Sequence, residues 1–105
     1  MANANADPIV KEKIKPKLDL PPPHLFKVIY INDEVTTMEF VIQSLVEIFE
    51  HSPEAAAELC EKIHVDGAAV VAVLPYELAE QKGVEATMLA RNNGFPLLIR
   101  LEPAI

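Results

Sequence analysis

The alternation of hydrophobic and polar positions divides the chain beyond residue 24 into six segments. Residues 25–31 are rich in β-branched and aromatic side chains, which is typical of a β-strand. From about residue 37 to residue 50, apolar residues recur at helical spacing, which predicts an amphipathic helix that packs one face on a core. The apolar stripe of this helix is Met38, Val41, Ile42, Leu45, Val46 and Phe49.

Capping residues indicate where the first two helices begin and end. Thr36, with Glu39 three residues later, matches a capping box, so we expect the first helix to start there. Ser52 followed by Pro53 predicts the start of a second helix, and Gly67 predicts its end in a left-handed turn. We expect its inner face to be Ala56, Leu59, Cys60 and Ile63.

The second half of the chain follows the same logic. Residues 68–74 are continuously apolar and short, which favours a buried central strand. Pro75 opens a third helix that should reach residue 92 or 93, with Gly94 as its stop. Residues 97–101 form the last predicted strand. Small residues along one side of the third helix permit close packing on another element, namely Ala79, Gly83, Ala86 and Ala90.

The order strand, helix, helix, strand, helix, strand predicts an α+β domain in which three helices pack against a small three-stranded sheet. A chain of 105 residues has room for one core, which we place at residues 24–105. In residues 1–23, lysines alternate with Ile14, Pro16 and Leu18 without a helical stripe, and residues 21–23 are a polyproline spacer. We expect this segment to be a disordered, flexible N-terminal arm.

Composition and charge exclude several classes of function. Residues 1–23 carry a net charge of +1 from four lysines and three acids, and the remainder carries −8 from five basic and thirteen acidic residues. Such a domain repels phosphate backbones, so we expect no nucleic-acid partner. The single cysteine excludes an internal disulfide framework. Without a signal peptide or an apolar run near the roughly 20 residues that span a bilayer, we expect a soluble, cytoplasmic protein and no membrane partner.

The candidate binding site lies where the first strand ends, at Asn32, Asp33 and Glu34. A turn between a strand and a helix can present polar groups beside an apolar cavity. Carboxylates there favour a cation, and the apolar helix face beside them favours a large side chain. This pairing suits the free amino end of a polypeptide that begins with a hydrophobic residue. The alternative is a turn whose side chains satisfy only their own backbone.

Three separated motifs carry a resemblance to a known family. Residues 28–41 (VIYINDEVTTMEFV), residues 63–67 (IHVDG) and residues 96–98 (PLL) closely resemble ClpS, a family of bacterial adaptors that select proteins by their amino-terminal residue. The resemblance runs from about residue 25 to residue 102. It implies an antiparallel sheet and a monomeric, non-enzymatic adaptor without cofactors. Its partners would be N-degron proteins and the amino-terminal domain of a ClpA-type or ClpC-type unfoldase that works with the ClpP protease.

The resemblance also implies roles for individual residues. Asn32, Asp33 and His64 match the residues that hold the substrate's α-amino group, and they supply the three acceptors that an ammonium group requires. Taken alone, His64 is simply a cation at a helix end. The residues that match the hydrophobic pocket and its mouth are Thr36, Thr37, Met38, Val41, Cys60, Ile63 and Leu97, which periodicity alone describes as core residues.

A second matched site lies on the third predicted helix. Glu77 and Lys82 match the acid and base that help to dock the unfoldase. Without the resemblance, the sequence indicates only that they lie on a solvated face of the helix. Elsewhere the chain departs from the usual family pattern. Glu34 replaces an aspartate, Thr37 replaces a proline, and Cys60 stands where a methionine is common. Cys60 should leave more room in the pocket, so these differences bear on selectivity.

Three further readings remain as alternatives. Cys60 and His64 are four residues apart on one helical face, as a thiol catalyst would require, but Cys60 falls in an apolar stripe. A metal site could combine Cys60, His64 and Asp33, which is a weak set of ligands. A structural module similar to the carboxy-terminal domain of the ribosomal stalk protein would share the fold. Such a module should have a basic helix face, whereas residues 24–105 of this chain carry a net charge of −8.

Overall fold

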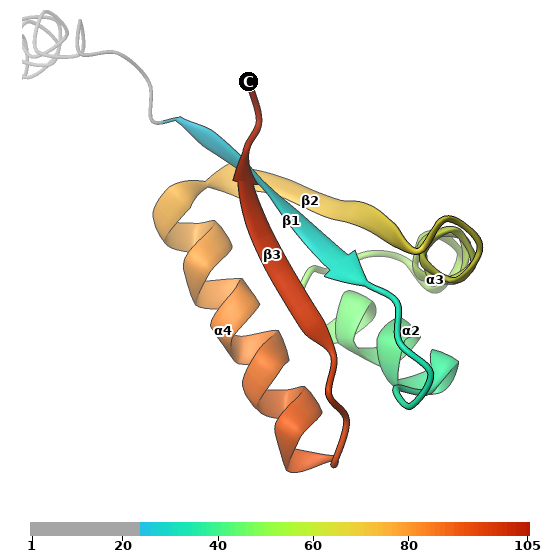
Figure 1. Cartoon of the computed structure of the whole chain (residues 1–105). Coiled ribbons are helices and arrows are strands. Elements are labelled where there is room, and N and C mark those ends of the chain that lie inside the picture. The colour runs from blue at the N-terminus through green and yellow to red at the C-terminus, as the bar shows by residue number, and fades with distance from the viewer. Residues whose placement is uncertain (1–23) are drawn as a thin grey trace, which may run out of the picture.

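The computed structural model describes residues 24–105, and these residues form three strands and three helices. The predicted arm at residues 1–23 lies outside the described residues. The observed order of elements is β-α-α-β-α-β, as the sequence predicts (Figure 1). The elements are β1 (Leu25–Ile31), α2 (Met38–Glu47), α3 (Pro53–Asp66), β2 (Ala68–Pro75), α4 (Tyr76–Asn92) and β3 (Leu98–Pro103).

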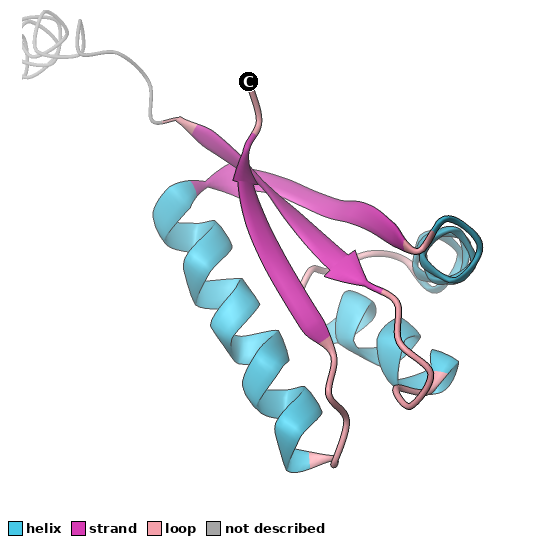
Figure 2. Cartoon of the chain, viewed as in Figure 1, coloured by secondary structure: helices cyan, strands magenta, loops and turns pink. Residues whose placement is uncertain are grey.

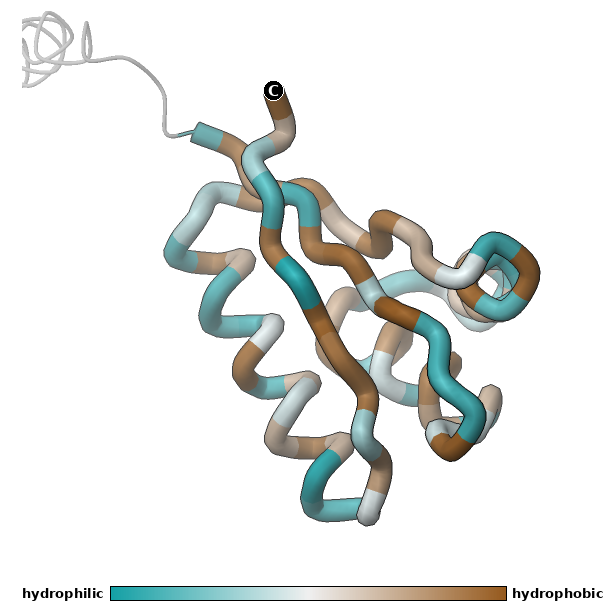
Figure 3. The backbone as a smooth tube through the Cα atoms, in the orientation of Figure 1, coloured by the Kyte–Doolittle hydropathy of each residue, from teal (hydrophilic) through white to brown (hydrophobic). Residues whose placement is uncertain are grey.

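The sheet is antiparallel and has the strand order β2-β1-β3, so β1 is the central strand. The expectation of a buried central strand at residues 68–74 is wrong, because β2 lies at an edge of the sheet and only Ala69 and Val71 of its residues are buried. Helix α4 packs across all three strands, α3 packs against β2, and α2 packs mainly against α3 (Figure 2). Hydrophobic residues concentrate along β1 and at the start of β3, whereas α4 alternates between hydrophobic and hydrophilic positions (Figure 3). The expected α+β class and the antiparallel sheet are therefore confirmed.

A bulge interrupts the pairing of β1 with β2. Val28 pairs with Ala72 and Ile29 pairs with Val70, so Val71 is an extra residue in β2. The carbonyl oxygen of Val71 lies 2.7 Å from the Nε2 atom of His51. A carbonyl can only accept, so His51 donates from Nε2 and satisfies the carbonyl at the bulge.

The core lies between the sheet and the helices, and Tyr30 is fully buried in it. Its hydroxyl is 2.8 Å from Ser44 Oγ, and Ser44 Oγ donates to the carbonyl of Val41 at 2.9 Å. Because the serine has one proton, Tyr30 is the donor in the first of these bonds. Burial, partly opposed by the Ser44 hydrogen bond, raises the pKa of Tyr30 to about 12.

The ends of the elements agree with the prediction except at α2, at β3 and at Pro75, which ends β2 and is the N-cap of α4 rather than its first residue. Thr37, not Thr36, is the N-cap of α2, and its side chain accepts from the backbone of Phe40 at 3.2 Å. The helix ends at Glu47 rather than near residue 50, where Glu50 adopts a left-handed φ of 62°. Strand β3 begins one residue later than expected and runs to Pro103.

The predicted caps of α3 and the small-residue side of α4 are confirmed. The Ser52 side chain accepts from the backbone of Ala55 at 3.1 Å, and Gly67 ends α3 with a φ of 88°. On the inner face of α3, Leu59 is only partly buried. The buried residues of this face and of α4 are Ala56, Cys60, Ile63, Ala79, Gly83, Ala86 and Ala90.

Candidate functional site

Three distant segments meet at one end of the sheet. Ile31, the last residue of β1, lies opposite Ala68 of β2 and Leu98 of β3. The antiparallel pairing therefore brings the end of β1 close to the end of α3 and the start of β3. The backbone N–H of Asn32 donates to the carbonyl of Gly67 at 2.9 Å, which fixes the turn after β1 against the end of α3.

Asp33 organises this turn. Its Oδ1 accepts from the backbone N–H groups of Val35 and Thr36, both at 2.7 Å, and its Oδ2 accepts from Thr36 Oγ1 at 2.7 Å. The expectation that Asp33 could satisfy its own backbone is thus correct. An ionised carboxylate offers about four lone-pair directions, however, so three internal bonds leave acceptor capacity for a ligand cation.

The same contacts determine the charge of Asp33. Partial burial raises its pKa, but hydrogen bonds from Thr36 and Val35 and the nearby positive charge of Arg91 outweigh burial and lower the pKa from its ordinary value. The turn therefore holds a carboxylate that is ionised at neutral pH. A fixed negative charge at this position is what a ligand ammonium group requires.

Arg91 is a site residue that sequence reasoning missed. Its Nη1 atom donates to the carbonyls of Phe95 at 3.0 Å and Leu97 at 2.9 Å, so it fixes the loop that leads into β3. Its charge also acts on Asp33. A basic residue in the last turn of a helix is a recognisable C-terminal signal. Its electrostatic effect on Asp33, which is 58 positions away in the sequence, could not be predicted from any local sequence pattern.

Asn32 and His64 provide the exposed polar part of the site. His64 lies in the last turn of α3, one helical turn before Gly67. Both residues are exposed. Within the described part of the chain, neither side chain takes part in a hydrogen bond, so the Asn32 amide and the His64 imidazole are available to a ligand.

The predicted pocket residues divide into a buried group and an exposed group. Thr37 and Met38 are exposed at the start of α2, Met38 by 46%, and Thr36 is half-buried. The Cys60 thiol lies 3.7 Å from the carbonyl oxygen of Met38, so α2 and α3 are in contact at this point. The buried residues, all part of one core cluster and at most 6% exposed, are Val41, Cys60, Ile63 and Leu97.

Other kinds of chemistry find little support at this site. Cys60 is buried, and burial, followed by the charges of Glu61 and Glu39, raises the pKa of its thiol, which disfavours the thiolate that a nucleophile needs. Within residues 24–105, no three His, Cys, Asp or Glu side chains come together as a metal site would require. In the same range, no helix has the length and apolar character to cross a bilayer.

The two predicted docking residues have different environments on α4. Glu77 is exposed in the first turn of the helix. Lys82 is half-buried, and its Nζ atom donates to the backbone carbonyl of Ile48 at 2.8 Å. Helix α2 has no basic residue in its last turn, so Lys82 supplies the positive charge at that helix end. Sequence spacing did not predict this structural role.

Comparisons with known proteins agree with one another. The family model of the ATP-dependent Clp protease adaptor protein ClpS matches residues 21–100. ClpS of Clostridium acetobutylicum is 39% identical over 86% of this chain and 89% of its own length. ClpS of Escherichia coli is 40% identical over 93% of this chain and 91% of its own. A solved structure of Agrobacterium tumefaciens ClpS2 bound to L-phenylalaninamide superposes with a TM-score of 0.75 at 39% identity, covering 78% of this chain and 99% of that one.

Proposed function

The chain belongs to the ClpS family of Clp protease adaptors, and from this premise we propose that it selects proteins by a free amino-terminal Leu, Phe, Tyr or Trp. It then delivers them to a Clp AAA+ unfoldase–protease without performing chemistry itself. The observation that carries the proposal is the Asn32–Gly67 hydrogen bond. This bond joins the turn that holds Asp33 to the helix end that holds His64.

The polar half of the site is suited to an α-ammonium group. Such a group has three N–H donors and no acceptor. The Asn32 amide oxygen, the Asp33 carboxylate and a neutral His64 imidazole nitrogen supply three acceptors, and Asp33 supplies the opposite charge. A charge-assisted hydrogen bond contributes about 1.5–3 kcal/mol, which makes the free amino group a strong determinant of binding.

The apolar half receives the first side chain. Val41, Cys60, Ile63 and Leu97 belong to one core cluster, and the Cys60 thiol lies 3.7 Å from the backbone carbonyl of Met38, so we assign to the exposed Met38 side chain the control of entry to the pocket. Burial of a Leu or Phe side chain contributes roughly 1.5–3 kcal/mol. After the cost of association, this supports micromolar affinity and ready release of cargo. The ligand of the similar ClpS2, L-phenylalaninamide, combines an α-amino group with an aromatic side chain.

Delivery requires a contact with the unfoldase in addition to the cargo site. Glu77 and Lys82 on α4 are the residues we assign to docking on the amino-terminal domain of a ClpA-type or ClpC-type unfoldase that works with ClpP. Lys82 is held between α4 and the end of α2, which gives the surface a defined shape. Residues 1–23 would serve as an extension that the unfoldase engages while a monomeric core retains its cargo.

A peptide panel tests the cargo proposal. The peptides differ only in the first residue, and each is made with a free and with an acetylated amino end. Micromolar binding of free Leu, Phe, Tyr and Trp peptides, with loss on acetylation, is the expected result. Equal affinity for free and acetylated peptides would overturn the proposal. A stalk-protein-like structural module, the alternative from a different class, would ignore the first residue altogether.

A further inference from the structure

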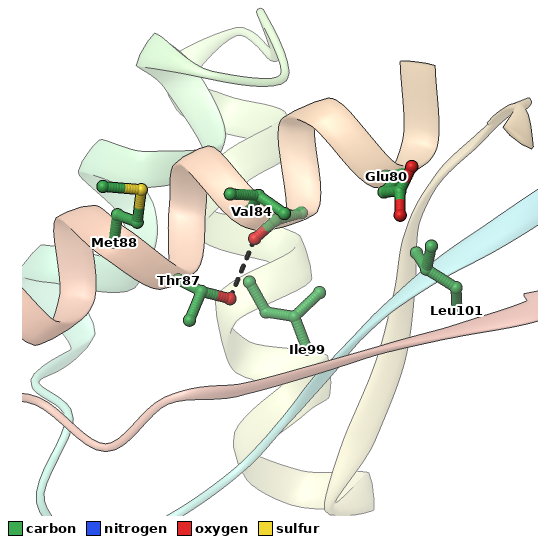
Figure 4. Close-up of a pocket in the computed structure, with 7 residues that line it drawn as sticks. Glu80, Val84, Thr87, Met88, Ile99 and Leu101 are labelled. Atoms are coloured by element: carbon green, nitrogen blue, oxygen red, sulfur yellow. Dashed lines mark hydrogen bonds between the residues drawn. The ribbon is translucent and has the colours of Figure 1, made fainter. Parts of the chain in front are cut away.

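A hollow lies between α4 and the edge strand β3, and none of the residues predicted for the binding site lines it (Figure 4). It has a volume of about 260 Å³ and an almost entirely apolar lining. The Thr87 hydroxyl donates to the Gly83 carbonyl at 2.8 Å, so this hydroxyl already has a partner. The residues that line the hollow are Glu80, Gly83, Val84, Thr87, Met88, Ile99 and Leu101.

The hollow is bordered by exposed apolar and acidic side chains. Val84 is 52% exposed and Met88 is 60% exposed, although both are large and hydrophobic. Met88 also lines an adjoining hollow between α2 and α4, together with Glu47 and Glu85. Among the described residues, the linings of the two hollows contain three carboxylates and neither lysine nor arginine. The hollow between α4 and β3 is thus an apolar groove with one carboxylate, Glu80, and with Glu47 and Glu85 in the adjoining hollow; we call it the α4–β3 groove.

The N-terminal arm carries the complementary pattern. From Lys11 to Leu18 the sequence reads KEKIKPKL, with lysine at every odd position and Ile14, Pro16 and Leu18 at even positions. In an extended backbone, successive side chains point to opposite sides, so the lysines share one side and the apolar residues share the other. No other segment of the chain has this alternation of lysine and apolar residues.

We propose that residues 11–18 bind in the α4–β3 groove of their own chain in an extended conformation. Ile14 and Leu18 contact the apolar surface of Val84, Met88 and Ile99. The lysines face away from the apolar surface, and their long side chains bend over its edge toward Glu80. Lysines on the outer side of the bound segment also protect the edge of β3 from further pairing. Pro16 is compatible with this position because an edge segment tolerates the loss of one N–H donor.

The point of attachment places the groove within reach. Residue 24 precedes β1, whose residue Phe26 pairs with Pro103 at the end of β3. Leu101, which lines the groove, is only two residues before Pro103. Residues 19–23 can span at most about 18 Å when extended, and the strand rises about 3.3 Å per residue. The arm can therefore enter the groove from the end of β3 without crossing the domain.

A spin label on the full-length chain tests the proposal without substrate or unfoldase. Val10→Cys in a Cys60→Ala background is labelled with a nitroxide, and the loss of amide signals is mapped along the chain. We expect the loss to concentrate at Val84, Met88 and Ile99, and to spare Val70 on β2. The matched control adds Ile14→Asp and Leu18→Asp in the arm, which leaves the core sequence intact and should abolish the effect at the groove.

Further outcomes are decisive in either direction. Met88→Glu and Val84→Glu, both at exposed positions, should likewise release the labelled arm from the groove and restore the amide signals there. High salt should weaken the loss of signal at the groove. Signal loss spread over all faces, or loss that survives Ile14→Asp and Leu18→Asp, would overturn the proposal. Signal loss in an unlabelled ¹⁵N chain mixed with a labelled ¹⁴N chain would assign the groove to a second copy instead. Because no peptide is present, failure here is distinguishable from failure of the cargo proposal.

Discussion

The backbone nitrogen of Asn32 lies 2.9 Å from the carbonyl oxygen of Gly67. This bond connects the end of the central strand to the residue that ends α3, so the two polar parts of the candidate site share one anchor. The φ of 88° at Gly67 is a backbone conformation that other residues rarely adopt. A side chain at Gly67 would therefore strain the anchor as well as the helix end.

Asp33 should show separate effects on stability and on binding. Asp33→Asn keeps one acceptor oxygen for the turn but removes the charge and the acceptor for the Thr36 hydroxyl, so we expect a small loss of stability and peptide binding weaker by about 1.5–3 kcal/mol. Asp33→Ala removes all three hydrogen bonds of the turn and should lose more stability, with about 0.5–1.5 kcal/mol expected for a typical bond. Calorimetric titration with a Phe-initiated peptide and chemical denaturation measure the two quantities. If Asp33→Asn binds normally, the carboxylate serves only the turn.

The pH dependence of stability provides a second check on Asp33. Its folded pKa is lower than the ordinary value of 3.8, so its stabilising effect is present above that value and is lost as the pH falls through the folded pKa. The stability advantage of the natural protein over Asp33→Asn should therefore shrink below about pH 4. An advantage that stays constant into strong acid would contradict the assignment.

Selectivity should depend on Met38 and Cys60. β-branched first residues need width next to the backbone, and we propose that the exposed Met38, whose carbonyl lies near the Cys60 thiol, narrows the pocket, so Met38→Ala should admit Ile and Val peptides. Cys60→Met should reduce Trp binding relative to Leu binding because it fills space in the pocket. Competition between fluorescent peptides measures both ratios. The claim for Cys60 fails if the Trp-to-Leu ratio is the same in both proteins.

Lys82 and Glu77 should differ in what their loss does. Lys82→Met keeps the aliphatic stem but removes the hydrogen bond to Ile48, so it should lower stability by about 0.5–1.5 kcal/mol and weaken unfoldase docking. Glu77→Gln, at an exposed position, should weaken docking alone. Thermal unfolding and binding to an isolated unfoldase amino-terminal domain separate the two effects. Normal docking of both variants would remove α4 from the unfoldase interface.

Alkaline unfolding should report on Tyr30. Its pKa rises from 10.0 to about 12 in the folded protein, so its contribution is complete below pH 10 and is lost as the pH rises through the folded pKa. The difference corresponds to about 2–3 kcal/mol. Tyr30→Phe should be less stable at neutral pH because it removes the bond to Ser44, yet its stability should fall less between pH 10 and 12. Parallel alkaline slopes for the two proteins would contradict this.

Removal of the arm should separate cargo binding from delivery. Deletion of residues 1–20 should leave peptide affinity nearly unchanged, because the candidate site lies at the opposite end of β1, and should abolish stimulated degradation of a Leu-initiated substrate. An unrelated flexible sequence of equal length should largely restore degradation. Degradation assays with the unfoldase and protease measure this outcome. Full activity of the shortened chain would show that delivery does not need the arm.

Much of the fold is predictable from local signals. Ser52, Pro53 and Gly67 specify the ends of α3 because each acts on its own helix terminus. The start of α2 was misplaced by one residue because Thr36 and Thr37 are both good caps. The competition is decided by Asp33, which takes the Thr36 hydroxyl for its own turn. The bulge at Val71 was not predicted, since nothing in a continuous apolar run indicates an extra residue.

The candidate site was predictable in its residue types but not in its supporting contacts. Asn32, Asp33 and His64 stand at element ends that the sequence indicates. Arg91 acts through loop carbonyls and through its charge near Asp33, and Lys82 caps a helix 34 positions earlier in the sequence. Such contacts depend on how α4 crosses the sheet, which no local periodicity describes.

The central position of β1 has a mechanical consequence. Its seven residues separate residue 24, to which residues 1–23 are attached, from the candidate site by about 23 Å along the strand. A pull on residue 24 would act along β1, which is hydrogen-bonded to a neighbour on each side. The load would be shared by two ladders in shear, so that no single bond bears it alone. A domain that is pulled at residue 24 would therefore resist unfolding while the candidate site at the other end of β1 retains its bound peptide.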